Sequence, residues 1–361
     1  MPGTFRKYTQ PWIGKPLFDT VFILLPPFAC LLFIVLFPSF FRNSKDMPEA
    51  WWVVLVLLID VAHVYSTLYR TYFDKDAYSK QRAILIAIPF VSFVCATLVY
   101  SISSMLFWRI LAYVAVYHFI RQQYGFLRLY SRKEISNRFY KFIDTITIYY
   151  ATIYPIIYWH VGASRNFNWF VNGDFFYYRS DWLMFTSTSL YYLVIGAYFL
   201  KEILVTIANH SVNFPKVAVI VGTIVSWYFG IVYYNGDMAF TLLNVVSHGI
   251  PYMALIWIYG QKKYQATVNN TGSVILKYVF SRYGAIVFLS IIFLLAFLEE
   301  GLWDMTVWKE HKNVFRWFHF SDLQFSHEVL SFIVPLLALP QITHYIVDGY
   351  IWRVRQDKSL Q

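Results

Sequence analysis

The sequence predicts an all-α integral membrane protein, a polytopic bundle of about ten transmembrane helices with the N- and C-termini in the cytoplasm. Three observations lead to this prediction. Of the 361 residues, 58% are hydrophobic and only 14% are charged, which is too little charge to cover a water-soluble globule of this size. Apolar runs of about 20 residues, the length that crosses a bilayer, recur along the whole chain. Lysine and arginine gather between alternate runs.

Apolar runs bounded by charged residues define the ten predicted helices. Their ranges are roughly 17–40, 51–69, 83–105, 107–128, 141–160, 183–203, 216–234, 238–260, 283–299 and 329–352. Residues 1–361 are predicted to form one transmembrane helical domain, with a cytoplasmic N-terminal segment at 1–16 and a cytoplasmic tail at 353–361. Residues 1–16 contain no apolar core, so no cleavable signal peptide is expected.

The positions of the cations set the predicted orientation, because short cytoplasmic loops are enriched in lysine and arginine. Cations of the predicted inner loops include Arg70, Lys201 and Lys216. The opposite loops mix a few cations with acids such as Glu299 and Glu300. An even number of helices with both termini inside fits this pattern. Topology thus accounts for the net charge of +10, and no nucleic-acid partner is expected.

The cysteine content limits the chemistry. Only two cysteines occur, Cys30 and Cys95, and both lie inside predicted helices. This excludes a disulfide framework and a cysteine-based zinc site.

Ionisable side chains inside apolar helices single out four of the ten predicted helices. Such a group is costly in lipid unless it is paired, hydrated or bound to a ligand. In each of the four helices a histidine lies three or four residues from a carboxylate or carboxamide, so both side chains share one helical face. The pairs are Asp60 with His63, His118 with Gln122, Asn244 with His248, and His344 with Asp348.

The four histidines are also predicted to share one depth. All four helices run from outside to inside in the predicted topology. Setting Arg121 aside, the histidines precede the first inner cation by seven residues (His63 to Arg70) to fourteen residues (His248 to Lys262). At ~1.5 Å per residue this corresponds to ~10–21 Å. The sequence therefore predicts a layer of histidines in the inner half of the membrane.

Histidine and carboxylate donors on facing helices of a bundle are how buried iron, manganese or zinc sites are built. The predicted metal ligands are Asp60, His63, His118, His248, His344 and Asp348. Gln122 and Asn244 are predicted to orient a histidine or to act as weak ligands. Arg121 could contact an anionic head group, or extend its charge to the membrane surface. The alternative for each histidine is a hydrogen bond between helices.

This donor set resembles, in ligand type, the integral-membrane non-haem iron oxygenases: fatty-acid desaturases, sterol and carotene hydroxylases, and one type of carotene dioxygenase. The resemblance implies iron held by histidines from several helices. The histidine boxes of desaturases and hydroxylases do not occur, since no two histidines lie closer than His311 and His319. The alkaline ceramidase and adiponectin-receptor group holds zinc with three histidines; its paired histidines are replaced here by His344 and Asp348. No residue role is carried over from either group.

The leading prediction is a membrane oxidoreductase with one or two iron ions, acting on a lipid-soluble substrate such as a fatty acyl, isoprenoid, carotenoid or sterol chain. Mixed histidine and carboxylate donors suit iron. A cytoplasmic electron donor and membrane lipids are the expected partners, because the site lies nearer the cytoplasmic face. The first alternative is an intramembrane zinc-dependent lipid hydrolase or transferase.

Two further alternatives belong to other functional classes, electron transfer and transport. Four histidines could form two axial pairs for haem-based electron transfer, although a neighbouring aspartate is not needed for that role. Histidine and aspartate chains also relay protons in transporters. Pro335 and Pro340 are expected to interrupt the last helix just before His344.

Overall fold

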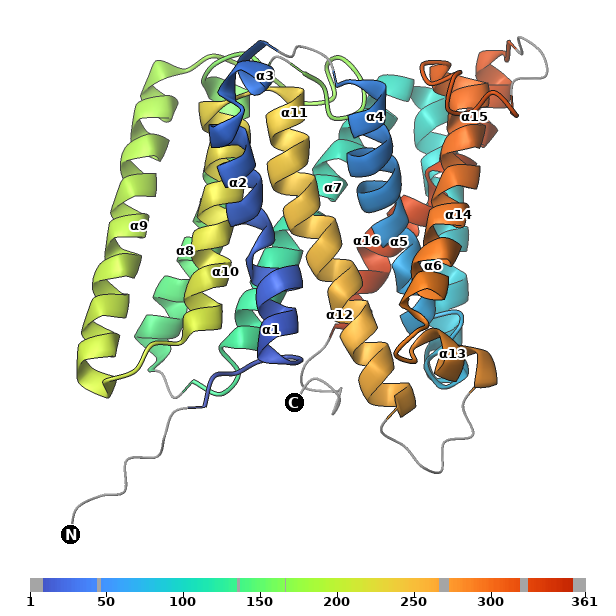
Figure 1. Cartoon of the computed structure of the whole chain (residues 1–361). Helices are drawn as coiled ribbons and strands as arrows, with labels where there is room; N and C mark the ends of the chain where they lie inside the picture. The colour runs from blue at the N-terminus through green and yellow to red at the C-terminus, as the bar shows by residue number, and fades with distance from the viewer. Residues whose placement is uncertain are drawn as a thin grey trace.

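The computed structural model describes residues 9–43, 47–134, 137–165, 167–265, 273–318 and 324–352. The predicted tail at 353–361 and residues 1–8 of the predicted N-terminal segment lie outside these ranges. The described residues form helices and no β-strand. Long helices lie side by side and run in the same general direction through the bundle (Figure 1). The all-helical prediction is confirmed.

In the first half of the described chain, several long helical stretches are built from consecutive segments. In chain order the segments are α1 (Pro16–Asp19), η1 (Thr20–Leu24), α2 (Pro26–Leu36), α3 (Pro38–Asn43), α4 (Glu49–Trp52), η2 (Val53–Val61), α5 (Ala62–Ser66), η3 (Thr67–Arg70), α6 (Lys75–Ile102), α7 (Ser104–Tyr130) and α8 (Arg138–Val161). Segments η1 and η2 are π-helical, and η3 is a 3₁₀ turn.

The second half continues in the same way. Its segments are α9 (Asp181–Asn209), α10 (Phe214–Trp227), η4 (Tyr228–Tyr233), α11 (Asp237–Phe240), η5 (Thr241–Val245), α12 (Val246–Gln265), α13 (Val274–Val279), α14 (Ala285–Trp303), η6 (Asp304–Trp308), α15 (His327–Leu337) and α16 (Leu339–Ile351). Segments η4, η5 and η6 are π-helical.

Six of the described helical stretches are long and apolar enough to cross a membrane. They are Glu49–Arg70, Lys75–Ile102, Asp181–Asn209, Phe214–Tyr233, Asp237–Gln265 and Ala285–Trp308. Two bent pairs of helices, Pro16–Leu24 with Pro26–Leu36 and His327–Leu337 with Leu339–Ile351, bring the number to eight when each pair counts as one span. This composition is that of a helical membrane protein.

The ten predicted ranges all fall on helices, and the boundaries differ by up to nine residues. Two of the ten, α7 and α8 at predicted ranges 107–128 and 141–160, are not among the helices that are both long and apolar enough to cross a membrane. Helix α7 carries Arg109, Arg121 and Arg128, which lower its hydropathy. Its length is nevertheless 27 residues, more than a bilayer requires.

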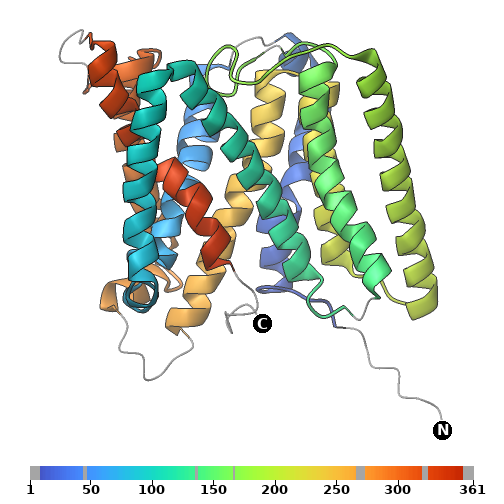
Figure 2. The same cartoon turned by 180° about the vertical axis from the view of Figure 1, so that it is seen from behind.

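Prolines account for the two bends. The first pair of helices is bent by 52° where Pro26 and Pro27 follow Leu25, and the second by 40° just before Pro340. A proline inside a helix removes one backbone hydrogen bond and clashes with the preceding turn. The predicted interruption before His344 is therefore present. As a consequence α16 slants through the bundle from mid-height toward the end at which α1 begins (Figure 2).

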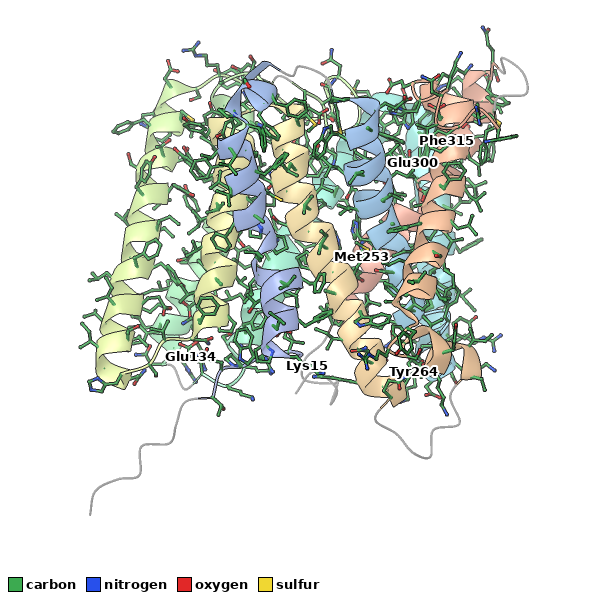
Figure 3. All side chains as sticks on the ribbon, viewed as in Figure 1. Lys15, Glu134, Met253, Tyr264, Glu300 and Phe315 are labelled. Atoms are coloured by element: carbon green, nitrogen blue, oxygen red, sulfur yellow. The ribbon has the colours of Figure 1, made fainter. Side chains whose placement is uncertain are left out.

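Both ends of the described chain lie at the same end of the bundle, where α1 begins and α16 stops (Figure 1). Lys15, Glu134 and Tyr264 lie at this end as well, whereas Phe315 lies at the opposite end (Figure 3). We refer to the end that holds Lys15 and Glu134 as the basic end, because the predicted inner loops lie there.

Two cations assigned to inner loops by the sequence are buried at the basic end instead. Lys216 is fully buried and Lys201 is 3% exposed. Lys216 Nζ lies 2.9 Å from Glu134 Oε1 and 2.6 Å from Glu202 Oε1, and Lys201 pairs with Asp144 and Glu202. This ion cluster joins α8, α9 and α10, since buried charges are retained only when paired.

Candidate metal centre

Four histidines from four separate passes meet inside the bundle. His63 lies on α5, His118 on α7, His248 on α12 and His344 on α16. None of the four is more than 3% exposed. One nitrogen from each ring lies within 4.8 Å of the others. The predicted gathering of these histidines at one place is therefore present, and the group could hold a metal ion.

The Nε2 atoms face one another. His63 Nε2 lies 3.2 Å from His248 Nε2, and His118 Nε2 lies 3.1 Å from His344 Nε2. Two nitrogens bound to one tetrahedral ion at ~2.0–2.1 Å would be about 3.4 Å apart. The observed pairs are close to that separation, while the 4.8 Å limit leaves the group wider than a closed tetrahedron. The four histidines could therefore hold a metal ion.

The Nδ1 atoms point away from this shared space. Asp60 Oδ1 lies 3.7 Å from His63 Nδ1. Asp348 lies behind two rings, with Oδ2 at 3.8 Å from His118 Nδ1 and Oδ1 at 3.8 Å from His344 Nδ1. Both aspartates were predicted as ligands, and the structure places them next to the histidines but outside the group of four. These separations are longer than a hydrogen bond, and His63 Nδ1 is buried without a hydrogen-bond partner among the described residues, so the carboxylates act on the rings through their charge.

Two hydroxyl groups that the sequence analysis missed connect this outer layer. Thr67 Oγ1 lies 2.7 Å from His344 Nδ1 and 2.8 Å from the Tyr252 hydroxyl oxygen. The Tyr252 hydroxyl donates to Asp348 Oδ1 at 2.5 Å. A signal for both exists in the sequence: Thr67 follows His63 by four residues, and Tyr252 follows His248 by four, which places each on the face of its histidine.

Gln122 and Asn244, which were predicted to orient a histidine or to act as weak ligands, both contact backbone carbonyl groups instead. Gln122 Nε2 donates to the His248 backbone carbonyl at 2.8 Å, so it contacts the backbone of α12 and not an imidazole. Asn244 Nδ2 donates to the backbone carbonyls of Ser226 and Phe240. The Asn244 side-chain oxygen is buried without a partner among the described residues. Neither amide hydrogen-bonds a histidine ring in the described structure.

Arg121 lies apart from the centre. Its guanidinium donates to the Tyr149 hydroxyl on α8 and lies over the Tyr124 ring. The side chain is exposed. A contact with an anionic head group at this position stays a prediction.

An aromatic ring supports His248. The imidazole stacks on Phe119, with ring centroids 3.7 Å apart and planes inclined by 7°. Phe119 is the residue after His118, so α7 supplies both a member of the histidine group and the surface that orients another member. This contact leaves His248 Nδ1 buried without a hydrogen-bond partner among the described residues.

Close helix packing brings His248 to His63. A Cβ atom on Gly249 would lie 2.8 Å from Ile59 Cγ2 and 3.0 Å from the Ile59 carbonyl oxygen. Only glycine allows α12 to approach η2 this closely. The π-helical segments η2 and η5 directly precede the parts of their passes that carry His63 and His248. Such segments shift the phase of a helix and occur frequently at functional sites.

Two acids lie inside the bundle rather than in an outer loop, which corrects their assignment from the sequence. Glu299 and Glu300 belong to α14 and are 5% and 8% exposed. The Tyr65 hydroxyl hydrogen-bonds Glu299, and the Asp60 carboxylate is close enough to Glu300 to interact electrostatically. Figure 3 shows Glu300 in the half of the bundle opposite the basic end. These acids extend the polar layer from Asp60 toward that half.

Comparison with known proteins adds no further information. The chain matches no family model, and no curated protein or solved structure matches it.

Proposed function

We propose that the protein is a membrane-embedded oxidoreductase in which His63, His118, His248 and His344 hold iron and the substrate is a lipid-soluble molecule. One observation carries this proposal: four buried imidazoles from separate passes direct nitrogen atoms into one space, within 4.8 Å of one another. Four neutral imidazoles so close together, with lone pairs facing, repel unless protons or a cation lie between them. A metal ion is the cation that this donor set binds best.

The aspartates have a supporting role in this proposal. Asp348 lies behind His118 and His344, and Asp60 lies behind His63. The carboxylates lie 3.7–3.8 Å from the ring nitrogens, which is beyond hydrogen-bond distance, so they would act through their negative charge, which favours a bound cation. Asp60 is 35% exposed at its side chain, whereas the His63 side chain is 2% exposed. The Asp60 side is therefore the direction from which a substrate would approach.

Bound iron would supply the oxidation chemistry of the non-haem oxygenases. The chain would supply the four histidine ligands and apolar surroundings that suit a fatty acyl, isoprenoid, carotenoid or sterol chain. Electrons would come from a cytoplasmic donor. The spacing also favours a non-haem ion over two haem groups, because each axial pair of histidines must flank a porphyrin plane.

A zinc-dependent lipid hydrolase or transferase is the second candidate. The two Nε2 pairs at 3.1 and 3.2 Å also suit tetrahedral zinc. Zinc would polarise a water molecule or a carbonyl group instead of carrying out oxidation. The two candidates share the four histidines and differ in the ion.

The topology proposed for this enzyme has ten transmembrane helices and both termini in the cytoplasm. The common position of the chain ends and the eight candidate spans support it, with α7 and α8 as the remaining two. His63 and His344 each lie seven residues before the last residue of their passes, Arg70 and Ile351. This supports a centre nearer the cytoplasmic face.

Elemental analysis tests the metal. Full-length protein purified without chelator should contain iron at one or two ions per chain, measured by mass spectrometry. His63→Ala should lower the content at least about tenfold, because removal of one of four ligands sacrifices a large part of the binding free energy. His160→Ala is the matched control, since His160 hydrogen-bonds Tyr113 away from the centre. Zinc in place of iron would favour the hydrolase or transferase, and absence of any bound metal would refute both.

An oxidation assay tests the reaction. Iron-loaded protein is supplied with a chemical reductant, dioxygen and a total lipid extract, and products are identified by mass spectrometry. The expected products have gained one or two oxygen atoms or lost two hydrogen atoms, and they should be missing with the His63→Ala variant. Hydrolysed lipids that form without dioxygen would exclude the oxidoreductase.

A further inference from the structure

Three carboxylates lie between α14 and the pass that carries His63. Glu299 and Glu300 belong to α14, and Asp60 belongs to η2. Helix α14 packs against both η2 and α5. Glu300 is close enough to Glu299 and Asp60 to interact with them electrostatically, and it lies in the half of the bundle opposite the basic end (Figure 3). We refer to these three residues as the acid group.

Glu300 has no partner for its charge. The residue is 8% exposed, and within the described part of the chain its side chain forms no hydrogen bond and no ion pair. Its electrostatic neighbours are three other carboxylates, Asp304 among them. Asp304 differs from Glu300, because its side chain accepts hydrogen bonds from the backbone N–H groups of Glu310 and His311 at 2.8 and 2.7 Å. Glu300 is therefore the member of this region that lacks a counterpart.

The rest of the acid group also lacks a cation. No lysine or arginine of the described residues pairs with Glu299 or Asp60. Glu299 Oε1 accepts a hydrogen bond from Trp303 Nε1 at 3.4 Å, whereas Oε2 is buried without a hydrogen-bond partner in the described ranges. Buried charges are retained only when paired, as they are in the cluster around Lys216. The acid group thus requires protons, or a cation from outside the chain.

A metal ion does not fit the acid group. Within the described ranges, the four histidines are the group of three or more potential ligands whose donor atoms all lie within 4.8 Å, and the acids do not form another. An ammonium group suits acids that are spaced more widely. Its three N–H donors meet carboxylate oxygens at ~2.7–2.9 Å, whereas zinc–oxygen bonds are ~2.0–2.2 Å long.

Aromatic side chains next to the acids also suit an organic cation. The Tyr65 hydroxyl hydrogen-bonds Glu299, and Tyr345 lies near enough to Asp60 and Glu299 to interact with both. A cation over the face of an aromatic ring is attracted by the electrons of the ring, and the attraction is stronger where water is excluded.

The acid group is accessible on the Asp60 side, because the Asp60 side chain is 35% exposed. Leu298 and Leu302 flank the two glutamates along α14 and are 44% and 41% exposed. A hydrocarbon chain can therefore remain in the bilayer against α14 while only its small ammonium group reaches the acids. No cavity for a whole lipid is needed.

We propose that the acid group binds the ammonium group of an amphiphilic primary amine, whose hydrocarbon chain stays in the bilayer. Glu300 and Asp60 accept hydrogen bonds from the nitrogen and balance its charge. Asp60 Oδ1 lies 3.7 Å from His63 Nδ1, so this head group is next to the histidine centre. The proposal names the substrate class of the oxidoreductase, and in that respect it rests on the proposed function. Binding itself requires no metal ion, so the two can fail separately.

Photolabelling tests the binding. The probe is hexadecylamine with a diazirine close to the nitrogen, added to chelator-treated full-length protein in phosphatidylcholine nanodiscs. Labelling should saturate and should map by mass spectrometry to peptides of η2, α5, α14 or α16. Hexadecylamine should compete at least about tenfold better than hexadecanol, because hydrogen bonds between charged partners are roughly twice as strong as those between neutral ones.

A variant that removes one charge locates the interaction. Glu300→Gln keeps the shape of the side chain and should abolish the preference for hexadecylamine over hexadecanol. Because the substitution removes a buried charge without a partner, the unfolding midpoint of the ligand-free protein should not fall. Glu310→Gln is the matched control, since Glu310 is exposed and lies outside the acid group, and it should keep the preference of the wild type.

Several results would overturn the proposal. Equal competition by hexadecylamine and hexadecanol in the wild type would mean that the acids hold protons. An unchanged preference in Glu300→Gln, or an equal loss in Glu310→Gln, would place the amine elsewhere. Labelling that appears only after metal is added would assign the nitrogen to the metal centre. Protein without bound metal that still shows the amine preference would refute the enzyme and keep this site.

Discussion

His63 Nε2 and His248 Nε2 lie 3.2 Å apart, although 185 residues separate the two histidines in the sequence. Both nitrogens are directed at the same space as those of His118 and His344. Outside that space, each ring has its own surroundings: a carboxylate for three of them, and the face of Phe119 for His248. The centre is therefore held from behind by packing and hydrogen bonds, and predictions can address the support as well as the ligands.

Thr67→Val should weaken metal binding while the fold is retained. Valine keeps the shape of threonine but removes the hydroxyl that contacts His344 Nδ1 and Tyr252. Loss of such a supporting contact typically reduces metal affinity about 10–100-fold. Competition titration with a metal-sensitive dye measures the change. Thr97→Val is the control, because the buried Thr97 hydroxyl has no partner among the described residues and its removal should leave affinity unchanged.

Gly249→Ala should also lower metal affinity, for a steric reason. The new Cβ would lie 3.0 Å from the Ile59 carbonyl oxygen, so α12 must move away from η2 and carry His248 with it. Gly196→Ala provides the comparison, since no atom lies within 4 Å of a Cβ built there. That variant should be stabilised by up to about 1 kcal/mol through helix propensity. Equal thermal stability and equal metal content in the two variants would contradict the prediction.

Removal of the metal should lower the thermal stability of the wild-type protein. An ion that binds only the folded state adds about 2.7 kcal/mol to the free energy of unfolding at 100 times its Kd, and about 4.1 kcal/mol at 1,000 times. The unfolding midpoint in detergent should fall on chelation and recover when the ion is returned. His118→Ala should melt at the same temperature with and without chelator. A midpoint of the wild type that does not respond to chelator would argue against a structural contribution of the ion.

Lys216→Met should destabilise the protein without affecting metal content. Lys216 is fully buried between Glu134 and Glu202, so its removal takes away the cation beside Glu134 and leaves Lys201 alone to balance Asp144 and Glu202. Breaking a buried ion pair on one side costs about 3–5 kcal/mol. The unfolding midpoint should fall clearly, whereas Lys133→Met, at an exposed position near the same end, should change it little. If both variants melt alike, the ion cluster is not what holds α9 and α10 to α8.

Some features of the centre could not be read from the sequence. The spacing of Asp60 and His63 shows that both lie on one helix face, but not which ring nitrogen faces inward. That depends on the contacts behind each ring, which come from residues on other passes. The burial of Glu299 and Glu300 was missed because acids at the end of an apolar run also fit an outer loop, and only the neighbouring Tyr65 distinguishes the two.

The amino-acid sequence by itself determined that the chain is helical and apolar enough for a membrane, and which four helices carry an imidazole beside a polar partner. These properties are local: they follow from composition and from a repeat of about 3.6 residues. Only the tertiary structure decided that the four rings converge, that the aspartates lie behind them, and that Thr67 and Tyr252 join the polar layer. Helix rotation and crossing depend on close packing, on bends at proline, and on π-helical turns that shift the phase of each pass.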